Sequence, residues 1–310
     1  MTAPLGKRAY TPAPAADFVL PFDLPDIGLR GRFARLGPVA TRALSAHPLP
    51  EPAQRTLGEA LTLAALLGSS LKQTGRMSVQ TKSGGPLSLV TADFIAGGGL
   101  RGYARLDAER FATLNGDATF ANLTGEGVLA ITIEPKAVRD SAPNAYQGIV
   151  PLAPEGLAAS AEDYFDQSEQ LVTALRLAAG PVYRAGLHGW CAGGLMVQAT
   201  PETKGNVRET DDWQRIALFL ETLEDYELLD SIVPAEDVLW RLFHEDEVRV
   251  HTAEPLRFHC GCGPEKVSSV LKSYGASELA DLAEADGVVR AKCEFCGAVY
   301  EFPLREFSEQ

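Results

Sequence analysis

Residues 260–296 read CGCGPEKVSSVLKSYGASELADLAEADGVVRAKCEFC and hold four of the five cysteines of this 310-residue chain. They form two close pairs, Cys260-Gly-Cys262 and Cys293-Glu-Phe-Cys296, separated by thirty residues. A tetrahedral zinc ion takes four soft ligands at about 2.3 Å, and two short facing turns can supply them. The spacing therefore predicts that residues 257–310 form a small module around one zinc ion.

These sulfurs could form either a permanent structural site or a redox switch. Thiolates bound to zinc are already deprotonated, and the thiolate is the form that oxidants attack. A disulfide across one intervening residue closes a strained ring and should be easy to reduce. A small module that folds only on its metal would unfold when oxidation ejects that metal. The residues alone leave both interpretations open.

The remaining candidate side chains give no catalytic pattern. His259 adjoins Cys260, but with four sulfurs available it is expected to be a neighbour and not a ligand. Cys191, with no partner nearby in sequence, is expected to be a buried structural thiol. No GxSxG elbow, phosphate-binding loop or dinucleotide fingerprint occurs, so no enzyme activity is predicted. A thiol oxidoreductase using Cys293 and Cys296 is disfavoured, because well-spaced ligands would keep those thiols on a metal.

Composition limits the environment of the chain. It is 45% hydrophobic and 22% charged, which is ordinary for a globular protein with a sizeable core. The chain contains no run of about 18 apolar residues, so no membrane-spanning helix is predicted. Residues 1–24 are rich in proline and alanine, lack the apolar block of a signal peptide, and are expected to be a flexible leader. Clustered cysteines suit a reducing compartment, so we expect a cytoplasmic protein without membrane partners.

The excess negative charge is concentrated in residues 201–256. The net charge is −13, and residues 201–256 carry 15 acidic against 5 basic side chains. A protein that binds nucleic acid should present a basic face to the phosphates. The acidic segment beside the cysteine module therefore argues against nucleic acid. A zinc-ribbon adaptor for nucleic acid or protein partners remains the alternative function.

Residues 25–200 predict an α+β domain with an antiparallel sheet. Helical spacing of leucines predicts a helix over 51–72, and a helix is expected to start at residue 160 with the Ser160 hydroxyl as its cap. Gly97–Gly99 is expected to be a hairpin tip. Strands are predicted from alternation and turn residues at 28–44, 77–81, 87–90, 100–106, 128–133, 146–150, 175–177 and 195–198.

Residues 201–256 predict a linker of short amphipathic helices with acidic outer faces, two of them separated by Pro234. Such short helices are marginal alone, so they need a partner surface, which the first domain can offer. Because the acidic faces repel one another, docking is expected to be weak. The apolar positions are Trp213, Ile216, Leu220, Leu223, Leu239 and Phe243.

Taken together, these motifs resemble a known family. The Cys-X-Cys and Cys-X-X-Cys pairs are joined by Glu162-Asp-Tyr-Phe165, a turn at Ala192-Gly-Gly194, and Val238-Leu-Trp-Arg-Leu-Phe-His244. The combination is similar to the bacterial redox-regulated holdase chaperone called the thirty-three-kilodalton heat-shock protein. The resemblance covers about residues 25–303.

The resemblance implies a mechanism. The reduced protein would hold one Zn²⁺ on Cys260, Cys262, Cys293 and Cys296 and be inactive. Oxidants would form the disulfides Cys260–Cys262 and Cys293–Cys296 and release zinc. The module would then unfold and the linker would lose its dock. Unfolding client proteins would bind without ATP, in part through the six apolar linker positions given above, and the active form would tend to be a homodimer.

Overall fold

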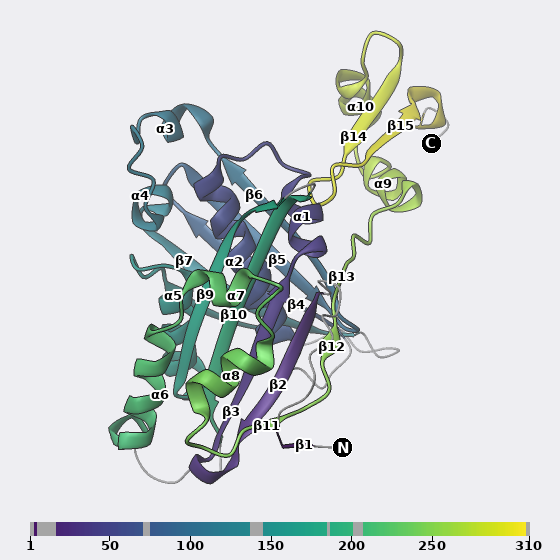
Figure 1. Ribbon diagram of the computed structural model, residues 1–310. Helices are drawn as coiled ribbons and strands as arrows, with labels where there is room; N and C mark the ends of the chain where they lie inside the picture. Colours follow the sequence, from purple (N-terminus) through teal and green to yellow (C-terminus); the bar gives the residue numbers. More distant parts are fainter. Residues whose placement is uncertain are drawn as a thin grey trace. The chain divides into compact units, whose positions relative to one another are not determined.

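The computed structural model describes residues 3–4, 17–70, 75–136, 145–184, 187–200 and 207–307. The chain divides into two compact units, Met1–Phe258 and His259–Gln310 (Figure 1). The first unit contains two hydrophobic cores and the second contains a third, smaller one. The expected α+β class, with antiparallel sheets, helices and a C-terminal cluster of four cysteines that could bind a metal, is confirmed.

The first sheet has the strand order β1-β11-β2-β3-β10-β9, and β12 also pairs with β2. All of its pairings are antiparallel. Its long strands are β2 (Phe18–Leu24), β3 (Leu29–Leu36), β9 (Thr173–Arg184) and β10 (Leu187–Ala199). Its short edge strands are β1 (Ala3–Pro4), β11 (Arg249–Val250) and β12 (Glu254–Pro255).

The second sheet has the order β13-β6-β5-β4-β7-β8. It is antiparallel except where β13 joins β6 in parallel. Its strands are β4 (Gly75–Ser83), β5 (Leu87–Ile95), β6 (Gly99–Leu106), β7 (Gly127–Pro135), β8 (Tyr146–Pro151) and β13 (Arg257–Phe258). Gly97 and Gly98 have positive φ between β5 and β6, which confirms the expected hairpin tip.

Helix α2 (Glu51–Gly68) packs between the two sheets. Its apolar positions include Leu57 and Leu61, and both are fully buried. A Cβ on Gly58 would lie 2.6 Å from Ala179 of the first sheet, and one on Gly102 would lie 3.0 Å from Leu57. The central helix therefore touches both sheets closely. The predicted helix is confirmed to residue 68; residues 71–72 lie outside the described part of the chain.

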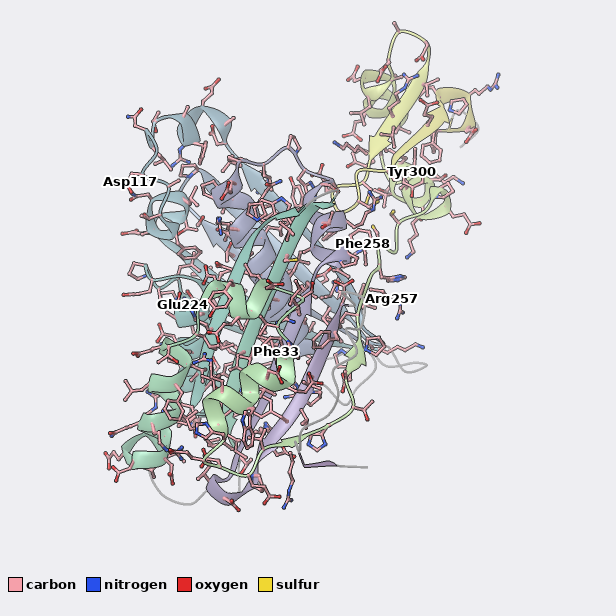
Figure 2. All side chains as sticks on the ribbon, viewed as in Figure 1. Phe33, Asp117, Glu224, Arg257, Phe258 and Tyr300 are labelled. Atoms are coloured by element: carbon pink, nitrogen blue, oxygen red, sulfur yellow. The ribbon has the colours of Figure 1, made fainter. Side chains whose placement is uncertain are left out.

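The opposite face of the first sheet is covered by three helices of the acidic segment, α6 (Asp211–Glu221), α7 (Asp225–Leu229) and α8 (Ala235–Phe243). Figure 1 shows them in green across β9, β10 and β3. Phe33, labelled in Figure 2, lies on this face and belongs to the core that the helices share with the sheet. The remaining helices of the first unit are α1 (Pro38–Leu44), α3 (Ala108–Ala112), α4 (Phe120–Thr124) and α5 (Leu157–Tyr164).

The second unit contains α9 (Pro264–Leu271), α10 (Ala276–Leu282) and the antiparallel hairpin of β14 (Val288–Lys292) and β15 (Val299–Pro303). Its described core has five buried residues: Leu271, Leu279, Val289, Phe302 and Phe307. The expected module boundary at 257 was wrong by two residues. Arg257 and Phe258 pair with β6 because the chain still runs beside the second sheet there.

Two expectations near the N-terminus were wrong. Residues 18–24, expected to belong to a flexible leader, form β2, because alternate side chains of this segment are buried in the first sheet. The strand expected over 28–44 ends at Leu36, and α1 follows it. Asp17 causes this break, because its carboxylate accepts hydrogen bonds from the backbone N–H of Gly37 at 2.7 Å and of Val39 at 3.1 Å.

Two further local expectations were also wrong. Ser160 lies inside α5, which begins after Gly156; its hydroxyl donates to the Gly156 carbonyl at 2.8 Å and accepts from the Ala153 N–H. Ala192-Gly-Gly194 is not a turn but lies within β10. Glycine there permits close approach of other segments and does not reverse the chain.

Candidate metal centre

Two turns of the second unit bring the four cysteines together. The first turn, Cys260–Cys262, precedes α9, and Lys266 Nζ donates to the Gly261 carbonyl at 2.6 Å. The second turn joins β14 to β15. There Cys293 N–H donates to the Ala298 carbonyl and Gly297 N–H donates to the Cys293 carbonyl, both at 2.8 Å. Gly297 has φ of 72°, so this tight turn needs glycine.

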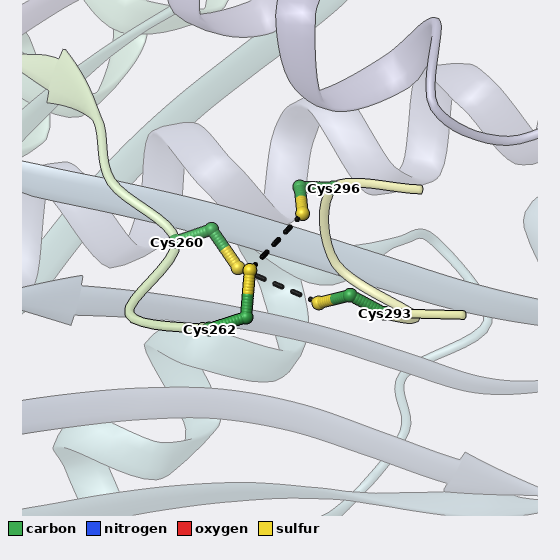
Figure 3. A group of neighbouring side chains, drawn as sticks. All are labelled: Cys260, Cys262, Cys293 and Cys296. Atoms are coloured by element: carbon green, nitrogen blue, oxygen red, sulfur yellow. Dashed lines mark hydrogen bonds between the residues drawn. The ribbon is translucent and has the colours of Figure 1, made fainter. Parts of the chain in front are cut away.

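All four Sγ atoms lie within 4.8 Å of one another (Figure 3). The sulfurs of Cys260 and Cys293 are 3.5 Å apart, and those of Cys262 and Cys296 are 3.4 Å apart. Ligands placed tetrahedrally at about 2.3 Å from zinc would be separated by about 3.8 Å. The four thiols can therefore hold one metal ion.

The short sulfur contacts change the acidity of the thiols. Burial opposes ionisation of Cys262, but hydrogen bonds from Tyr300 and the other cysteines outweigh it and lower its pKa to about 7. The Tyr300 hydroxyl lies 3.1 Å from Cys262 Sγ. Burial raises the pKa of Cys260 to about 12. Cys262 therefore ionises more readily than Cys260, and a bound dication would stabilise further negative charges.

The other candidate ligands lie elsewhere. His259 is exposed and stands outside the group of four sulfurs. Cys191 lies in β10, partly buried and not part of this group. The two sulfur–sulfur contacts given above run between the two turns. The disulfides Cys260–Cys262 and Cys293–Cys296, which lie within each turn, stay a prediction.

The six apolar linker positions predicted to contact clients are buried against the first sheet. Each is no more than 8% exposed, and they share one core with β2, β3, β9 and β10. Phe243 stacks on Phe22 with ring centroids 5.8 Å apart. In this arrangement these side chains are inaccessible to another protein, so any contact with clients requires the linker to leave the sheet.

The sequence and the fold of this chain match a known family. A family model described as Hsp33 protein matches residues 17–303. This chain belongs to the Hsp33 family. The 33 kDa chaperonin of Caulobacter vibrioides is 38% identical over 288 residues, covering 92% of this chain and 94% of the relative. That of Hahella chejuensis is 36% identical over 296 residues, covering 95% and 96%.

A solved structure agrees with this assignment. The crystal structure of the 33 kDa chaperonin, or heat shock protein 33 homolog, of Thermotoga maritima has a TM-score of 0.74 and 25% identity, and the match covers 94% of this chain and 97% of that one. The resemblance inferred from the motifs is confirmed, and with it membership of a chaperone family. Among the residues that the structure describes, no helix is long and apolar enough to cross a membrane.

Arg35 fastens the linker of this Hsp33-family chain to the sheet, which sequence reasoning missed. Arg35 lies on β3 and is 5% exposed. Its guanidinium donates to the backbone carbonyls of Glu227 at 2.8 Å, Leu228 at 2.9 Å and Val233 at 2.7 Å. Because these acceptors are about 190 residues away along the chain, no local pattern could have identified them.

Two arginines of the linker pair with acidic side chains of the same segment, and the expectation that repulsion makes docking weak stays a prediction. Arg215 contacts Asp246 at 2.8 Å, and Arg241 contacts Glu227 at 2.7 Å. The carboxylates of both pairs are almost fully buried. The acidic side chains of α6–α8 are therefore partly neutralised in the docked state.

Gly193 lies where the linker backbone closely approaches the sheet. A Cβ on Gly193 would lie 2.5 Å from the Leu228 carbonyl oxygen, far inside a normal contact. That oxygen is also an acceptor for Arg35. Glycine at position 193 of β10 is thus required for α7 to reach the sheet. The sequence signal was the Gly-Gly pair, whose role was misread as a turn.

Glu59 of α2 gives the docked state a pH dependence. Burial, then the charge of Asp225 on α7, raises its pKa from 4.5 to about 7, and Arg55 and Arg176 oppose this increase. Because the pKa of Glu59 is higher in the folded than in the unfolded chain, the free energy of unfolding should fall as pH rises from about 4.5 to 7 and level off above pH 7.

We expect Glu59→Gln to remove part of this fall. The decrease in melting temperature between pH 5 and 7.5 should be smaller in the variant by a few degrees. Glu109→Gln, at an exposed position, is the control; equal pH dependence in both variants would contradict the assignment.

Proposed function

We propose that this protein is a redox-regulated, ATP-independent holdase that acts in the cytoplasm. In the reduced state Cys260, Cys262, Cys293 and Cys296 hold one Zn²⁺, which supplies the binding energy that folds the module. The observation that carries the proposal is the coexistence, in one chain, of a four-thiol cluster and a buried apolar linker surface. Membership of the Hsp33 family supports it.

Activation proceeds by oxidation of the two turns. At each turn, two thiolates transfer two electrons to hypochlorous acid, which leaves as chloride and hydroxide, and one disulfide forms. The products are Cys260–Cys262 and Cys293–Cys296. Sulfurs in disulfides are poor ligands, so the oxidised turns would no longer hold a zinc ion. The five-residue core is too small to keep the module folded without it.

The chain that joins linker and module carries the effect to the linker. Residues 254–258 lie along both sheets: Leu256 N–H donates to the Asp17 carbonyl at 2.9 Å and Arg257 N–H to the Gly98 carbonyl at 2.8 Å. Arg257 Nη1 also donates to the Gly97 carbonyl. Phe258 stands two residues before Cys260. Unfolding of the module would lengthen the mobile chain at this point and favour release of residues 254–258 and then of α6–α8.

The released helices then bind clients. Undocking exposes Trp213, Ile216, Leu220, Leu223, Leu239 and Phe243, which together form an apolar surface that unfolding proteins can cover. The acidic residues of the same segment keep the opened chain soluble. Two opened chains can also cover part of this surface against each other, which is consistent with an active homodimer.

A light-scattering assay tests the function. The zinc-loaded reduced protein and the protein treated with hypochlorous acid are each mixed with a heat-unfolded client enzyme. We expect the oxidised form to suppress aggregation at near-equimolar ratio and the reduced form to have little effect. Cys191→Ser, which removes the cysteine outside the cluster, should behave as the wild type. Oxidised, zinc-free protein that leaves aggregation unchanged would refute the holdase function.

A further inference from the structure

The face of β3 that packs towards α2 changes from apolar to basic side chains along the strand. Ala34 and Leu36 on this face are fully buried in the core around α2. The next two positions on the same face are Arg30 and Arg32, because side chains alternate along a strand. Gly31 and Phe33 point to the linker side, where a Cβ on Gly31 would strike the ring of Phe22. Two arginines thus stand side by side where the apolar core ends.

The Nε–H groups of both arginines lack acceptors among the described residues. The Nε atoms of Arg30 and Arg32 are buried and have no hydrogen-bond acceptor. In the described ranges of the chain, neither side chain makes an ion pair. Asp23 is directly opposite Arg30 on β2, but its carboxylate lies 2.6 Å from Nε2 of His251. Asp23, the acidic residue opposite Arg30, is therefore already paired with His251.

The pair is electrostatically unfavourable without a ligand. Burial, and then the charge of Arg30, lowers the pKa of Arg32, while Glu254 and Asp23 offset only part of this effect. A buried donor without an acceptor costs about 1–3 kcal/mol, and more when it is charged. Both side chains are only partly buried, so their outer nitrogens can reach an acceptor beyond the described residues, either water or an anion.

The spacing defines the chemistry of that acceptor. Residues two apart on a strand are separated by about 6.6 Å, so one small anion can lie between both guanidinium forks. Two forks, each able to donate two parallel hydrogen bonds, call for about four acceptor oxygens. A phosphate group has four and a carboxylate has two. Beside Arg30, across the strand pair, the buried amide of Gln198 donates to Thr173 Oγ1 at 3.0 Å, which makes this side of the site rigid.

We propose that Arg30 and Arg32 form a binding site for a phosphate-type oxyanion on the first sheet. The ligand is either free inorganic phosphate or the phosphate group of a larger molecule such as a nucleotide. Each guanidinium donates to two oxygens of the anion, and the positive charges of the pair are neutralised. The site involves none of the cysteines and no linker helix, so it is independent of the holdase proposal.

Thermal unfolding of the full-length, reduced, zinc-loaded protein tests the site. Melting temperature is followed against inorganic phosphate, and separately against pyrophosphate and adenosine monophosphate, with chloride at the same ionic strength as reference. We expect a saturable increase for the wild type. Arg30→Gln/Arg32→Gln should raise the half-saturating concentration at least tenfold and, without phosphate, should be at least as stable as the wild type because an unpaired charge pair is gone.

Arg105→Gln is the matched control, because Arg105 is an exposed arginine of β6 in the other sheet. It should keep the wild-type response, which separates binding from general stabilisation by phosphate. Arg32→Lys keeps the charge but not the fork, and should bind several-fold more weakly. Tighter binding of the nucleotide than of phosphate would identify a larger ligand; the reverse would identify the free ion.

Nitrogen-15 NMR of the arginine side chains in the wild-type protein gives a second measurement, which remains valid if a variant does not fold. Phosphate should shift the Nε–H signals of Arg30 and Arg32 and leave that of Arg105 unchanged. The proposal is overturned if phosphate gives no saturable stabilisation, if the double variant responds like the wild type, or if the Arg30 and Arg32 signals do not move.

Discussion

Replacing Cys293 by serine is expected to unfold the second unit of the reduced, zinc-supplied protein while the first unit stays folded. Cys293 is one of four sulfurs that lie within 4.8 Å of one another. A neutral serine hydroxyl is a poor zinc ligand, and structural zinc contributes on the order of 10 kcal/mol to the folding of small modules. The described core of five buried side chains cannot replace that contribution.

Zinc content and amide hydrogen exchange measure this result together. The variant should retain well under one equivalent of zinc, and β14 and β15 should lose protection. Strands β9 and β10 should keep theirs, because they belong to the other unit. Cys191→Ser is the matched control and should retain both zinc and protection. Protected β14 and β15 in zinc-free Cys293→Ser would mean that the module folds on its apolar core, and the proposed switch would be wrong.

The second large effect is expected from Gly193→Ala, which should release the linker without any oxidant. The new Cβ would lie 2.5 Å from the Leu228 carbonyl oxygen, so α7 must move off the sheet. This movement would also break the Arg35 hydrogen bonds to Glu227, Leu228 and Val233. Overpacking of this kind costs about 1–3 kcal/mol, and the three lost bonds add to it.

Chaperone activity and dye binding check this expectation. The reduced, zinc-loaded variant should bind a hydrophobic dye, show faster amide exchange in α6–α8 and suppress client aggregation, while its zinc content stays that of the wild type. Gly84→Ala is the matched control, since a Cβ there meets nothing closer than 3.6 Å. If Gly193→Ala kept the linker protected and the protein inactive, then docking would not be the step that controls client binding.

Features with a local signal could be predicted from the sequence. Alternation and turn residues located the strands around 77–150, and the glycines at 97–99 located a hairpin tip. Helical spacing located α2 and α6–α8, and the cysteine spacing predicted a cluster that the fold brings together. Each of these signals lies within one element or one turn, where side-chain period and backbone preference act directly.

Strand β2 shows where local reasoning failed. Its sequence, FVLPFDL, contains a proline and follows a Pro/Ala-rich stretch, which suggested a leader. Pairing with β3 on one side and with β11 and β12 on the other makes it part of the sheet. Ser160 failed for a related reason: its hydroxyl could cap a helix, but a loop N–H from Ala153 reaches it in the folded chain.

By itself, the sequence determined the four thiols, the acidic amphipathic helices and the central helix α2, because these depend on residue type and short spacing. Only the tertiary structure decided that Arg35 holds the linker, that Gly193 lets α7 approach, and that the Nε–H groups of Arg30 and Arg32 have no acceptor among the described residues. The Arg35 contacts join segments that are 192 to 198 residues apart. Their free energy comes from burial and hydrogen bonds that exist only after the sheet has assembled, so no window of sequence contains them.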